Sequence, residues 1–355
     1  PQAAPRRLAA VRLVKGSGRT LAASAQAVAI AAAVSGSAVA GTSEGPCAVP
    51  AELAGGGDHP GMVWIDGGTF TMGSAEHHPE ERAPHEVTLE GFWIDRHEVT
   101  NAQFARFVEA TSYRTLAERG LDPEKYPGMP PELLVPGSMV FFVPEQLADM
   151  ADVRQWWRYV PGADWRHPTG PDSSIEGKDD HPVVHVAYED AFAYARWAGR
   201  RLPTEAAWEY AARGGLNGAA YSWGDSYDPV EGWQANSWQG LFPAKDETLD
   251  GHHGTAPVGC FDANGYGLFD MAGNVWEWTA DWYAPVHAAA PATDPTGPGM
   301  IQAAAASPDR LPRRVIKGGS WLCAPNFCAR YRPAARQPMD ADLGASHIGF
   351  RTVAR

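Results

Sequence analysis

The amino-acid sequence predicts one compact α+β domain with little regular secondary structure. Three observations carry this prediction. The chain has 355 residues, of which 44% are hydrophobic, so it is long and apolar enough to form a large core. Its 38 glycines and 30 prolines are typical of many turns and few long helices or strands. Its 14 tryptophans indicate a core closed by large aromatic side chains.

The first 60 residues differ from the rest and are expected to be a leader followed by a glycine-rich linker. Basic residues between Arg6 and Arg19 precede an uncharged, alanine-rich stretch over residues 21–41, in which residues 38–40 resemble a cleavage site. This order is typical of an export signal, and a disordered alanine-rich leader is the alternative. We therefore expect an exported protein, periplasmic or secreted, rather than a cytoplasmic one. No other stretch has the length of a membrane span.

Residues 61–355 are expected to form the folded domain, which begins with short strands. Residues 61–65 and 68–72 alternate in polarity around Asp66-Gly67, which predicts a β-hairpin. Residues 92–95 predict another strand. Thr100 is a predicted N-cap of a helix that continues to Ala110.

The next segment, residues 121–169, is irregular and rich in proline, so it is either disordered or a functional surface loop, and its three tryptophans favour the second. Its tryptophans, Trp156, Trp157 and Trp165, either line a peptide groove or belong to the core.

Two helices are predicted after this segment. Residues 181–186 indicate a buried strand, and residues 190–198 a helix that Gly199 ends. Thr204 is the predicted N-cap of a second helix that extends to Arg213 and stops at two glycines. Beyond it, short aromatic clusters alternate with glycine and asparagine, and regular periodicity fades.

The charge balance excludes one class of partner. With 29 basic and 42 acidic residues the chain has a net charge of −13. Nucleic-acid phosphates require a basic surface, so we expect no nucleic-acid partner. A substrate with basic residues suits this acidic chain better.

The cysteines offer a candidate site. Cys323 and Cys328 are five residues apart, so they either form a small disulfide loop or bind one soft metal ion, and spacing alone favours the disulfide. Cys47 lies in the linker, and Cys260 is interpreted as a buried apolar thiol. Histidines with acidic neighbours are interpreted as a solvated acidic loop rather than a metal cluster; they are His77, His78 and His85. His252-His253 is read in the same way.

Four sequence blocks together resemble the formylglycine-generating enzyme (sulfatase-modifying factor) family. The blocks are residues 199–210 (GRRLPTEAAWEY), 273–278 (GNVWEW), 318–320 (GGS) and 349–351 (GFR), and the resemblance runs from about residue 61 to residue 355. It implies the fold of that family, which is C-type-lectin-like. It also implies an enzyme, an oxidase that uses O₂ to convert a cysteine in a Cys-x-Pro-x-Arg segment of sulfatases to Cα-formylglycine.

For the cysteine pair, the resemblance favours a metal site over a structural disulfide. It implies that Cys323 and Cys328 are catalytic and bind Cu(I), for which thiolates are suitable soft ligands. A substrate cysteine then completes the site. Further implied site residues are Ser320 near the copper or the substrate, Trp276 as an apolar wall, and Arg330, which with Arg332 favours the thiolate forms. We expect the protein to be a monomer.

The resemblance also implies two structural Ca²⁺ sites. The first comprises Asn236, Ser237, Asp250 and His252, and the second Asp270, Gly273, Val275 and Glu277. Side-chain and backbone oxygens in glycine-rich turns are the ligands that Ca²⁺ prefers. From the residues alone, ordinary Asx turns are the alternative.

The sequence departs from the family pattern at a few positions. Ala324 replaces a histidine, Gly344 a serine and His347 an asparagine, at positions that border the pocket in the family. Pro333 replaces a cysteine, so the family's extra disulfides are expected to be missing. These departures leave two alternatives open: a non-catalytic or repurposed binding protein of this fold, and an oxidase of the same fold with another substrate.

Overall fold

The structure is a computed structural model that describes Cys47 and residues 58–146, 149–150, 152–227 and 232–355. The expected leader, with its export signal, lies outside the described residues. The His59 ring stacks on Trp93 of the folded domain at a centroid distance of 4.8 Å. Among the described residues, no helix combines the length and the apolar character that a membrane span needs.

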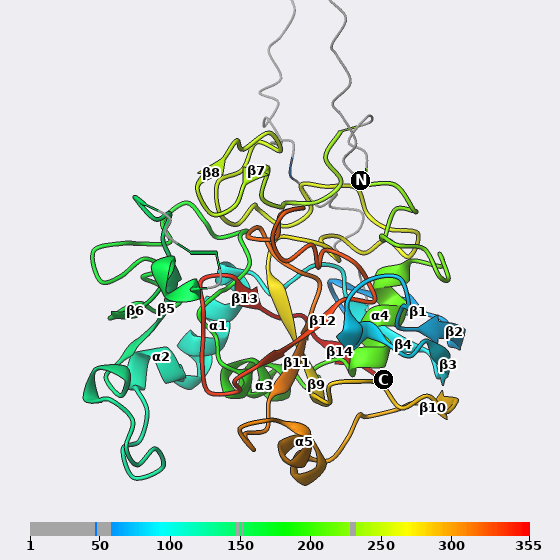
Figure 1. Ribbon diagram of the computed structural model, residues 1–355, viewed down its shortest axis with the longest axis horizontal. Coiled ribbons are helices and arrows are strands. Elements are labelled where there is room, and N and C mark those ends of the chain that lie inside the picture. The colour runs from blue at the N-terminus through cyan, green and yellow to red at the C-terminus, as the bar shows by residue number, and fades with distance from the viewer. Residues whose placement is uncertain (1–46, 48–57, 147–148, 151, 228–231) are drawn as a thin grey trace, which may run out of the picture. The chain divides into compact units, whose positions relative to one another are not determined.

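Helices and strands are short, as the glycine and proline content predicts (Figure 1). The α-helices are α1 (Asn101–Thr111), α2 (Leu116–Arg119), α3 (Tyr188–Trp197), α4 (Glu205–Arg213) and α5 (Met300–Ala306). The 3₁₀ turns are η2 (Pro79–Glu81), η3 (Pro131–Leu133) and η4 (Val153–Gln155). The strands are β1 (Met62–Ile65), β2 (Gly68–Met72), β3 (His85–Leu89), β4 (Phe92–Asp95), β5 (Gly137–Phe141), β6 (Trp157–Pro161), β7 (Gly240–Leu241), β8 (Lys245–Asp246), β9 (Trp276–Trp282), β10 (Ala292–Thr293), β11 (Arg314–Lys317), β12 (Arg336–Met339), β13 (Ile348–Gly349) and β14 (Val353–Ala354).

The helix predictions are confirmed, because their signals are local. Thr100 caps α1 through its side chain, which accepts a hydrogen bond from the backbone N–H of Gln103, and Gln103 returns one to Thr100. Thr204 caps α4, and Gly214 ends it in the left-handed conformation with φ +56°. Helix α3 also ends as predicted, with Gly199 just beyond it at φ +69°.

The predicted hairpin is wrong, although both of its strands exist. Strand β1 pairs antiparallel with β4, with Trp64 opposite Trp93, and β2 pairs with β3, with Phe70 opposite Val87. Alternating polarity identifies a strand but not its partner, and here the chain crosses from one sheet to another at Asp66-Gly67. An added Cβ at Gly67 would lie 2.5 Å from the carbonyl oxygen of Leu89, so this crossing packs directly on the turn between β3 and β4.

Two further predictions fail for related reasons. Residues 181–186 are buried but form no regular strand: their backbone bonds to Val99 and Ala345 are isolated, and His185 has φ +60°. The segment 121–169 is less irregular than expected, since it contains the antiparallel pair β5–β6. Trp156 and Trp165 are buried in the core, whereas Trp157 is half-buried.

The candidate site lies at the end of the central sheet, whose strand order is β12-β11-β9-β13. In Figure 1 this sheet lies between α1, α2, β5 and β6 on one side and α4 with β1–β4 on the other. Buried charges fix α4 to the sheet: Lys317 of β11 lies 3.0 Å from Glu209 Oε2, and Arg336 of β12 lies 2.6 Å from Glu205 Oε1. The strand that leads to the cysteines is therefore held at its last residue.

The interpretation of Cys260 as a buried apolar thiol is wrong, because a second disulfide is present. Cys260 is not a free apolar thiol, because it is bonded to Cys47, 213 residues earlier in the chain. This disulfide does not involve position 333, so it does not bear on the expectation that Pro333 removes a disulfide of the family. Spacing in the sequence carries no information about a pair so far apart.

Candidate active site

Cys323 and Cys328 lie opposite each other because the chain between them folds back on itself. Ala324 and Phe327 form two backbone hydrogen bonds with each other, of 2.8 and 3.0 Å, which close a tight turn. The two flanking cysteines therefore face one another and form a disulfide, with their Cα atoms 5.0 Å apart. Cys323 is buried and Cys328 is half-buried, so the pair spans from the core to the surface.

The turn is anchored by the glycine pair that follows β11. An added Cβ at Gly319 would lie 2.8 Å from the backbone nitrogen of Tyr331, so β11 and the segment after Cys328 approach as closely as a glycine allows. Ser320 is fully buried, and its backbone carbonyl accepts a hydrogen bond of 2.9 Å from the N–H of Cys323. The sequence Gly-Gly-Ser thus positions the first cysteine.

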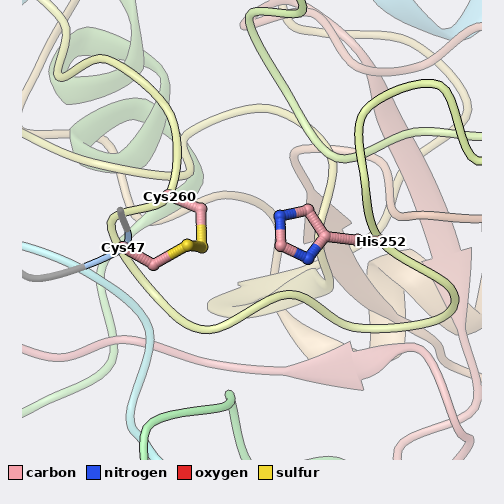
Figure 2. Close-up of side chains that lie close together, drawn as sticks. All are labelled: Cys47, His252 and Cys260. Atoms are coloured by element: carbon pink, nitrogen blue, oxygen red, sulfur yellow. A yellow bond between two sulfur atoms is a disulfide. The ribbon is translucent and has the colours of Figure 1, made fainter. Parts of the chain in front are cut away.

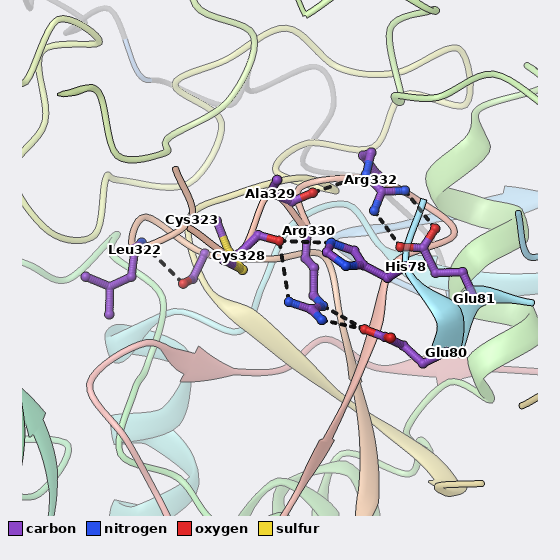
Figure 3. Close-up of a disulfide and its surroundings, with 10 residues drawn as sticks. His78, Glu80, Glu81, Leu322, Cys323, Cys328, Ala329, Arg330 and Arg332 are labelled. Atoms are coloured by element: carbon purple, nitrogen blue, oxygen red, sulfur yellow. Dashed lines mark hydrogen bonds and ion pairs between the residues drawn. A yellow bond between two sulfur atoms is a disulfide. The ribbon is translucent and has the colours of Figure 1, made fainter. Parts of the chain in front are cut away.

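The turn η2 holds the second cysteine from the other side (Figure 3). His78 Nε2 lies 3.1 Å from the carbonyl oxygen of Cys328. Glu80 pairs with Arg330 and Glu81 with Arg332, the closest N–O distance being 2.5 Å in each pair. The prediction of a solvated acidic loop is therefore wrong for this segment. Cys328 itself has φ +72° and Ala329 φ +48°, two successive left-handed residues that these contacts stabilise.

The ion pairs also limit the electrostatic effect expected of the arginines. Burial alone would raise the pKa of Glu80, but hydrogen bonds from Arg330 outweigh it and hold the pKa below its ordinary value. The Glu80 carboxylate therefore stays ionised and offsets the charge of Arg330 beside Cys328.

All five predicted catalytic residues line one cavity of about 310 Å³. Cys323, Cys328, Ser320, Trp276 and Arg330 meet there, although the sequence separates Trp276 from the cysteines by a long excursion through α5. Phe327, from the cysteine turn itself, and His347 also line the cavity. Further side chains come from segments that the sequence motifs did not connect with the cysteines; they include Trp157, Phe242 and Gln337. Of the three tryptophans weighed for a groove, Trp157 lines this cavity, whereas Trp156 and Trp165 do not.

Of the positions at which this sequence departs from the family pattern, His347 is the one that lines this cavity. Its ring packs on Trp157 at a centroid distance of 4.6 Å, and its Nδ1 is buried without a hydrogen-bond partner among the described residues. Burial, with His185 nearby, lowers the pKa of His347 to about 3, so the ring is neutral at physiological pH.

The other two departures do not border the cavity. Ala324 is buried in an aromatic cluster behind the turn, with Trp156 and Trp238. Gly344 packs against His185, whose carbonyl oxygen would lie 2.6 Å from an added Cβ. The expectation that these positions border the cysteine pocket is therefore wrong for Ala324 and Gly344.

The donor atoms fit a soft metal ion once the disulfide is reduced. Two sulfurs then face each other at the wall of a mostly apolar cavity, and thiolates in such surroundings suit Cu(I). In the disulfide form the same atoms have no ligand function. Trp157, Trp276 and Phe242 supply apolar side chains to the wall of this cavity.

The residues predicted for the first calcium site lie together. Asp250 Oδ1 accepts a hydrogen bond of 3.0 Å from the N–H of His252, and its Oδ2 accepts one of 3.3 Å from the N–H of Ser237. The amide of Gln239 donates both to this carboxylate and to the carbonyl of Ser237, so two of the expected ligand oxygens converge on one point. Burial raises the pKa of Asp250 above its ordinary value.

The second predicted calcium site holds a surplus of buried negative charge. Both oxygens of Glu277 accept hydrogen bonds from Arg351, at 2.7 to 2.9 Å. Among the described residues, no arginine lies within hydrogen-bonding distance of the side-chain carboxylates of Asp270 and the nearby Glu98; Arg351 reaches only the backbone carbonyl of Asp270, at 3.4 Å. The carboxylate oxygens of Glu98 are buried without hydrogen-bond partners among the described residues. Burial raises the pKa of Asp270 to about 6 and, together with the charge of Asp270, raises that of Glu98 well above its ordinary value. Three carboxylates around one guanidinium suit a cation, and sequence reasoning missed Glu98.

Comparisons with known proteins agree with this architecture. The family model of the sulfatase-modifying factor enzyme 1-like domain matches residues 50–355. A protein from Mycobacterium tuberculosis named formylglycine-generating enzyme is 54% identical over 293 residues, which cover 82% of this chain and 97% of that protein. A protein of the same name from Streptomyces coelicolor is 46% identical over 302 residues, with 82% and 88% covered.

A solved structure confirms the predicted fold class. The structure of PvdO from Pseudomonas aeruginosa superposes with a TM-score of 0.56 and 24% identity, covering 82% of this chain and 93% of that one. Likeness at this level of identity shows the fold alone. Together with the match over residues 50–355, it shows that the chain belongs to the family of proteins with a sulfatase-modifying factor enzyme 1-like domain.

Proposed function

We propose that this chain is a formylglycine-generating oxidase that acts on a cysteine in a Cys-x-Pro-x-Arg segment of a sulfatase polypeptide, with Cu(I) as cofactor and O₂ as oxidant. One observation carries the proposal: Cys323, Cys328, Ser320, Trp276 and Arg330 line the same cavity of about 310 Å³. The relatives named formylglycine-generating enzyme, one of them 54% identical, support the reaction class.

The cysteine pair has two states in this proposal. As a disulfide it is closed. A dithiol reductant that supplies two electrons and two protons would break the S–S bond and leave as its own disulfide; the two thiols of Cys323 and Cys328 would then hold Cu(I) as thiolates and release their protons. Copper supplies a site where O₂ and the thiolate of the substrate cysteine meet. Because binding displaces thiol protons, Cu(I) affinity falls as the pH is lowered.

The chain's own residues position the substrate and exclude water. Trp276, Trp157 and Phe242 supply apolar walls to the cavity that holds the sulfurs, and a peptide bound there would be positioned against them. Ser320 Oγ accepts a hydrogen bond of 3.3 Å from the N–H of Leu322, which leaves its hydrogen free to donate into the cavity. Arg330, held by Glu80, fixes the backbone that follows Cys328.

The acidic charge of the chain suits the proposed substrate. The net charge is −13, and the target segment ends in a basic arginine. Calcium in the two oxygen-rich sites has a structural role: it offsets the carboxylates of Asp250 and Asp270 and fixes the loops that precede β9.

Mass spectrometry of a synthetic peptide tests the proposal. The reduced protein is loaded with Cu(I) and incubated in air with a Cys-x-Pro-x-Arg peptide; we expect conversion of the cysteine to an aldehyde that a hydrazide reagent captures. A peptide with serine in place of the cysteine is the matched substrate control, and Cys323→Ser is expected to abolish conversion.

The alternatives give different results in the same assay. An unchanged peptide, with one copper demonstrably bound to the cysteine pair, contradicts the proposal and favours a binding protein of this fold. Oxidation of small thiols without conversion of the peptide contradicts the proposed substrate and favours an oxidase with another target.

A further inference from the structure

A second group of metal-binding side chains lies away from the cysteine cavity. Cys47, Cys260 and His252 place their sulfurs and a ring nitrogen within 4.8 Å of one another. Figure 2 shows the imidazole of His252 facing the sulfurs of the Cys47–Cys260 disulfide. None of the three residues lines the cavity of Cys323 and Cys328. The cluster therefore needs an explanation of its own.

Two of the three side chains are held on fixed turns. The residue before Cys260, Gly259, donates a backbone hydrogen bond of 2.7 Å to Asp270, and Val258 donates one of 2.9 Å to the carbonyl of Asp180. The backbone N–H of His252 donates one of 3.0 Å to Asp250. These contacts do not involve Cys47, so the positions of Cys260 and His252 do not depend on the disulfide.

The imidazole of His252 is not committed to another partner. Within the described part of the chain, neither of its ring nitrogens makes a hydrogen bond, and its ring contacts Phe261 edge-on at a centroid distance of 5.9 Å. All three side chains of the cluster are half-buried, so water can reach them. A free nitrogen beside two sulfurs is an incomplete ligand set rather than a finished structural contact.

We propose that Cys47, Cys260 and His252 form a redox-switched zinc site. In the oxidised state the two cysteines form the disulfide. A dithiol reductant transfers two electrons and two protons to it, which breaks the S–S bond and leaves the reductant as its own disulfide. Zn²⁺ then binds both sulfurs as thiolates and one nitrogen of His252, and the two thiol protons are released.

The geometry suits zinc. Zn–S bonds of about 2.3 Å in a tetrahedral site place two sulfurs about 3.8 Å apart. The existing ligand atoms already lie within 4.8 Å of one another, so small side-chain rotations complete the site. Three protein ligands leave a fourth position, which water fills on the exposed side.

In both redox states of this site, Cys47 remains linked to Cys260, either covalently or through the metal ion. Cys47 is joined to a turn 213 residues away, by the disulfide when oxidised and through zinc when reduced. Residue 47 thus stays attached to the domain in either state. This role is independent of the proposed oxidase activity.

Zinc binding by the full-length protein tests the proposal. In the Cys323→Ser/Cys328→Ser background, which removes the other thiol pair, the protein is reduced with a phosphine, and a chromogenic thiol reagent is used to confirm two free thiols. Zn²⁺ is then added, unbound ion is removed by gel filtration, and retained zinc is measured by mass spectrometry. Co²⁺ substitution gives an independent readout, because thiolate ligands produce a charge-transfer absorption band.

We expect about one zinc ion per reduced chain and none in the oxidised chain. Cys47→Ser removes binding without altering the turns that carry Cys260 and His252. His252→Ala lowers the affinity at least about tenfold, whereas the same change at the exposed neighbour His253 has no effect. The proposal is overturned if the chain with two free thiols retains no zinc, or if His252→Ala and His253→Ala bind zinc equally.

Discussion

The close approach at Gly319 gives the sharpest test of how the chain positions its cysteines. Gly319 has φ +74°, and a Cβ there would lie 2.8 Å from the nitrogen of Tyr331 and 2.9 Å from the carbonyl carbon and oxygen of Arg330. The change Gly319→Ala therefore adds a methyl group between β11 and the segment that follows Cys328. Because all three neighbours are backbone atoms, no side-chain rotation can relieve the contact.

A second glycine isolates the cost of the contact from the cost of the backbone conformation. Gly199 has φ +69°, but an added Cβ there meets no atom within 4 Å. Placing alanine in the left-handed region costs about 1–2 kcal/mol, and the less flexible unfolded chain returns about 0.4–1 kcal/mol. Gly199→Ala should therefore lower the free energy of unfolding by about 1 kcal/mol. Gly319→Ala adds about 1–3 kcal/mol of overpacking, for a total of about 2–4 kcal/mol.

Guanidinium unfolding followed by tryptophan fluorescence measures both variants, with the oxidised wild type as reference. The difference between the two glycine variants is the quantity of interest, since the conformational cost cancels. If Gly319→Ala destabilises the protein no more than Gly199→Ala, the strand and the cysteine segment do not approach as described, and the account of how the pair is positioned fails.

Three further outcomes follow from the same structure. Glu81→Gln should lower the free energy of unfolding by about 3–5 kcal/mol, because it leaves the buried Arg332 unpaired. Glu80→Gln breaks the more exposed pair with Arg330 and should lower it by about 1 kcal/mol or less. Equal losses for the two variants in urea unfolding would contradict this difference. In the calcium-free protein, burial raises the pKa of Asp270 to about 6 from 3.8, so the folded state binds more protons between these values and stability should fall as the pH rises through this window. Asp270→Asn should flatten that slope in thermal melts, and an unchanged slope would assign it to other groups. Cys47→Ser should lower the stability of the oxidised protein by up to about 5 kcal/mol, because the disulfide closes a long loop in the unfolded chain. In the Cys323→Ser/Cys328→Ser background, where Cys47–Cys260 is the disulfide that remains, reduction in a zinc-free buffer should have the same effect in thermal melts, and an unchanged melting temperature would contradict this role.

The sequence predicted a structural feature correctly where the residues that determine it lie close together in the chain. The caps of α1 and α4 involve residues three or four positions apart, so Thr100, Thr204 and Gly214 were identified correctly. Strand partners are not encoded in this way, and the predicted pairing of β1 with β2 failed because β4 and β3 are their true partners.

The candidate site also combines locally encoded features with contacts between distant segments. The cysteine turn and Ser320 lie in one short segment, so their motif was sufficient to bring them together. Two ion pairs join segments about 250 residues apart, Glu80 with Arg330 and Glu81 with Arg332. No pattern in either segment predicts these contacts. The same holds for Trp157, the first residue of β6, which reaches the cavity from a strand that packs there only in the folded domain.

The mass of a Cys-x-Pro-x-Arg peptide after aerobic incubation with the Cu(I)-loaded, calcium-replete protein tests the central claim most directly. The account predicts that sulfur in the peptide is replaced by oxygen as the aldehyde forms, and that Cys328→Ser prevents this while the fold is retained. An unchanged peptide mass, in a sample whose copper is shown to be bound by Cys323 and Cys328, would contradict it.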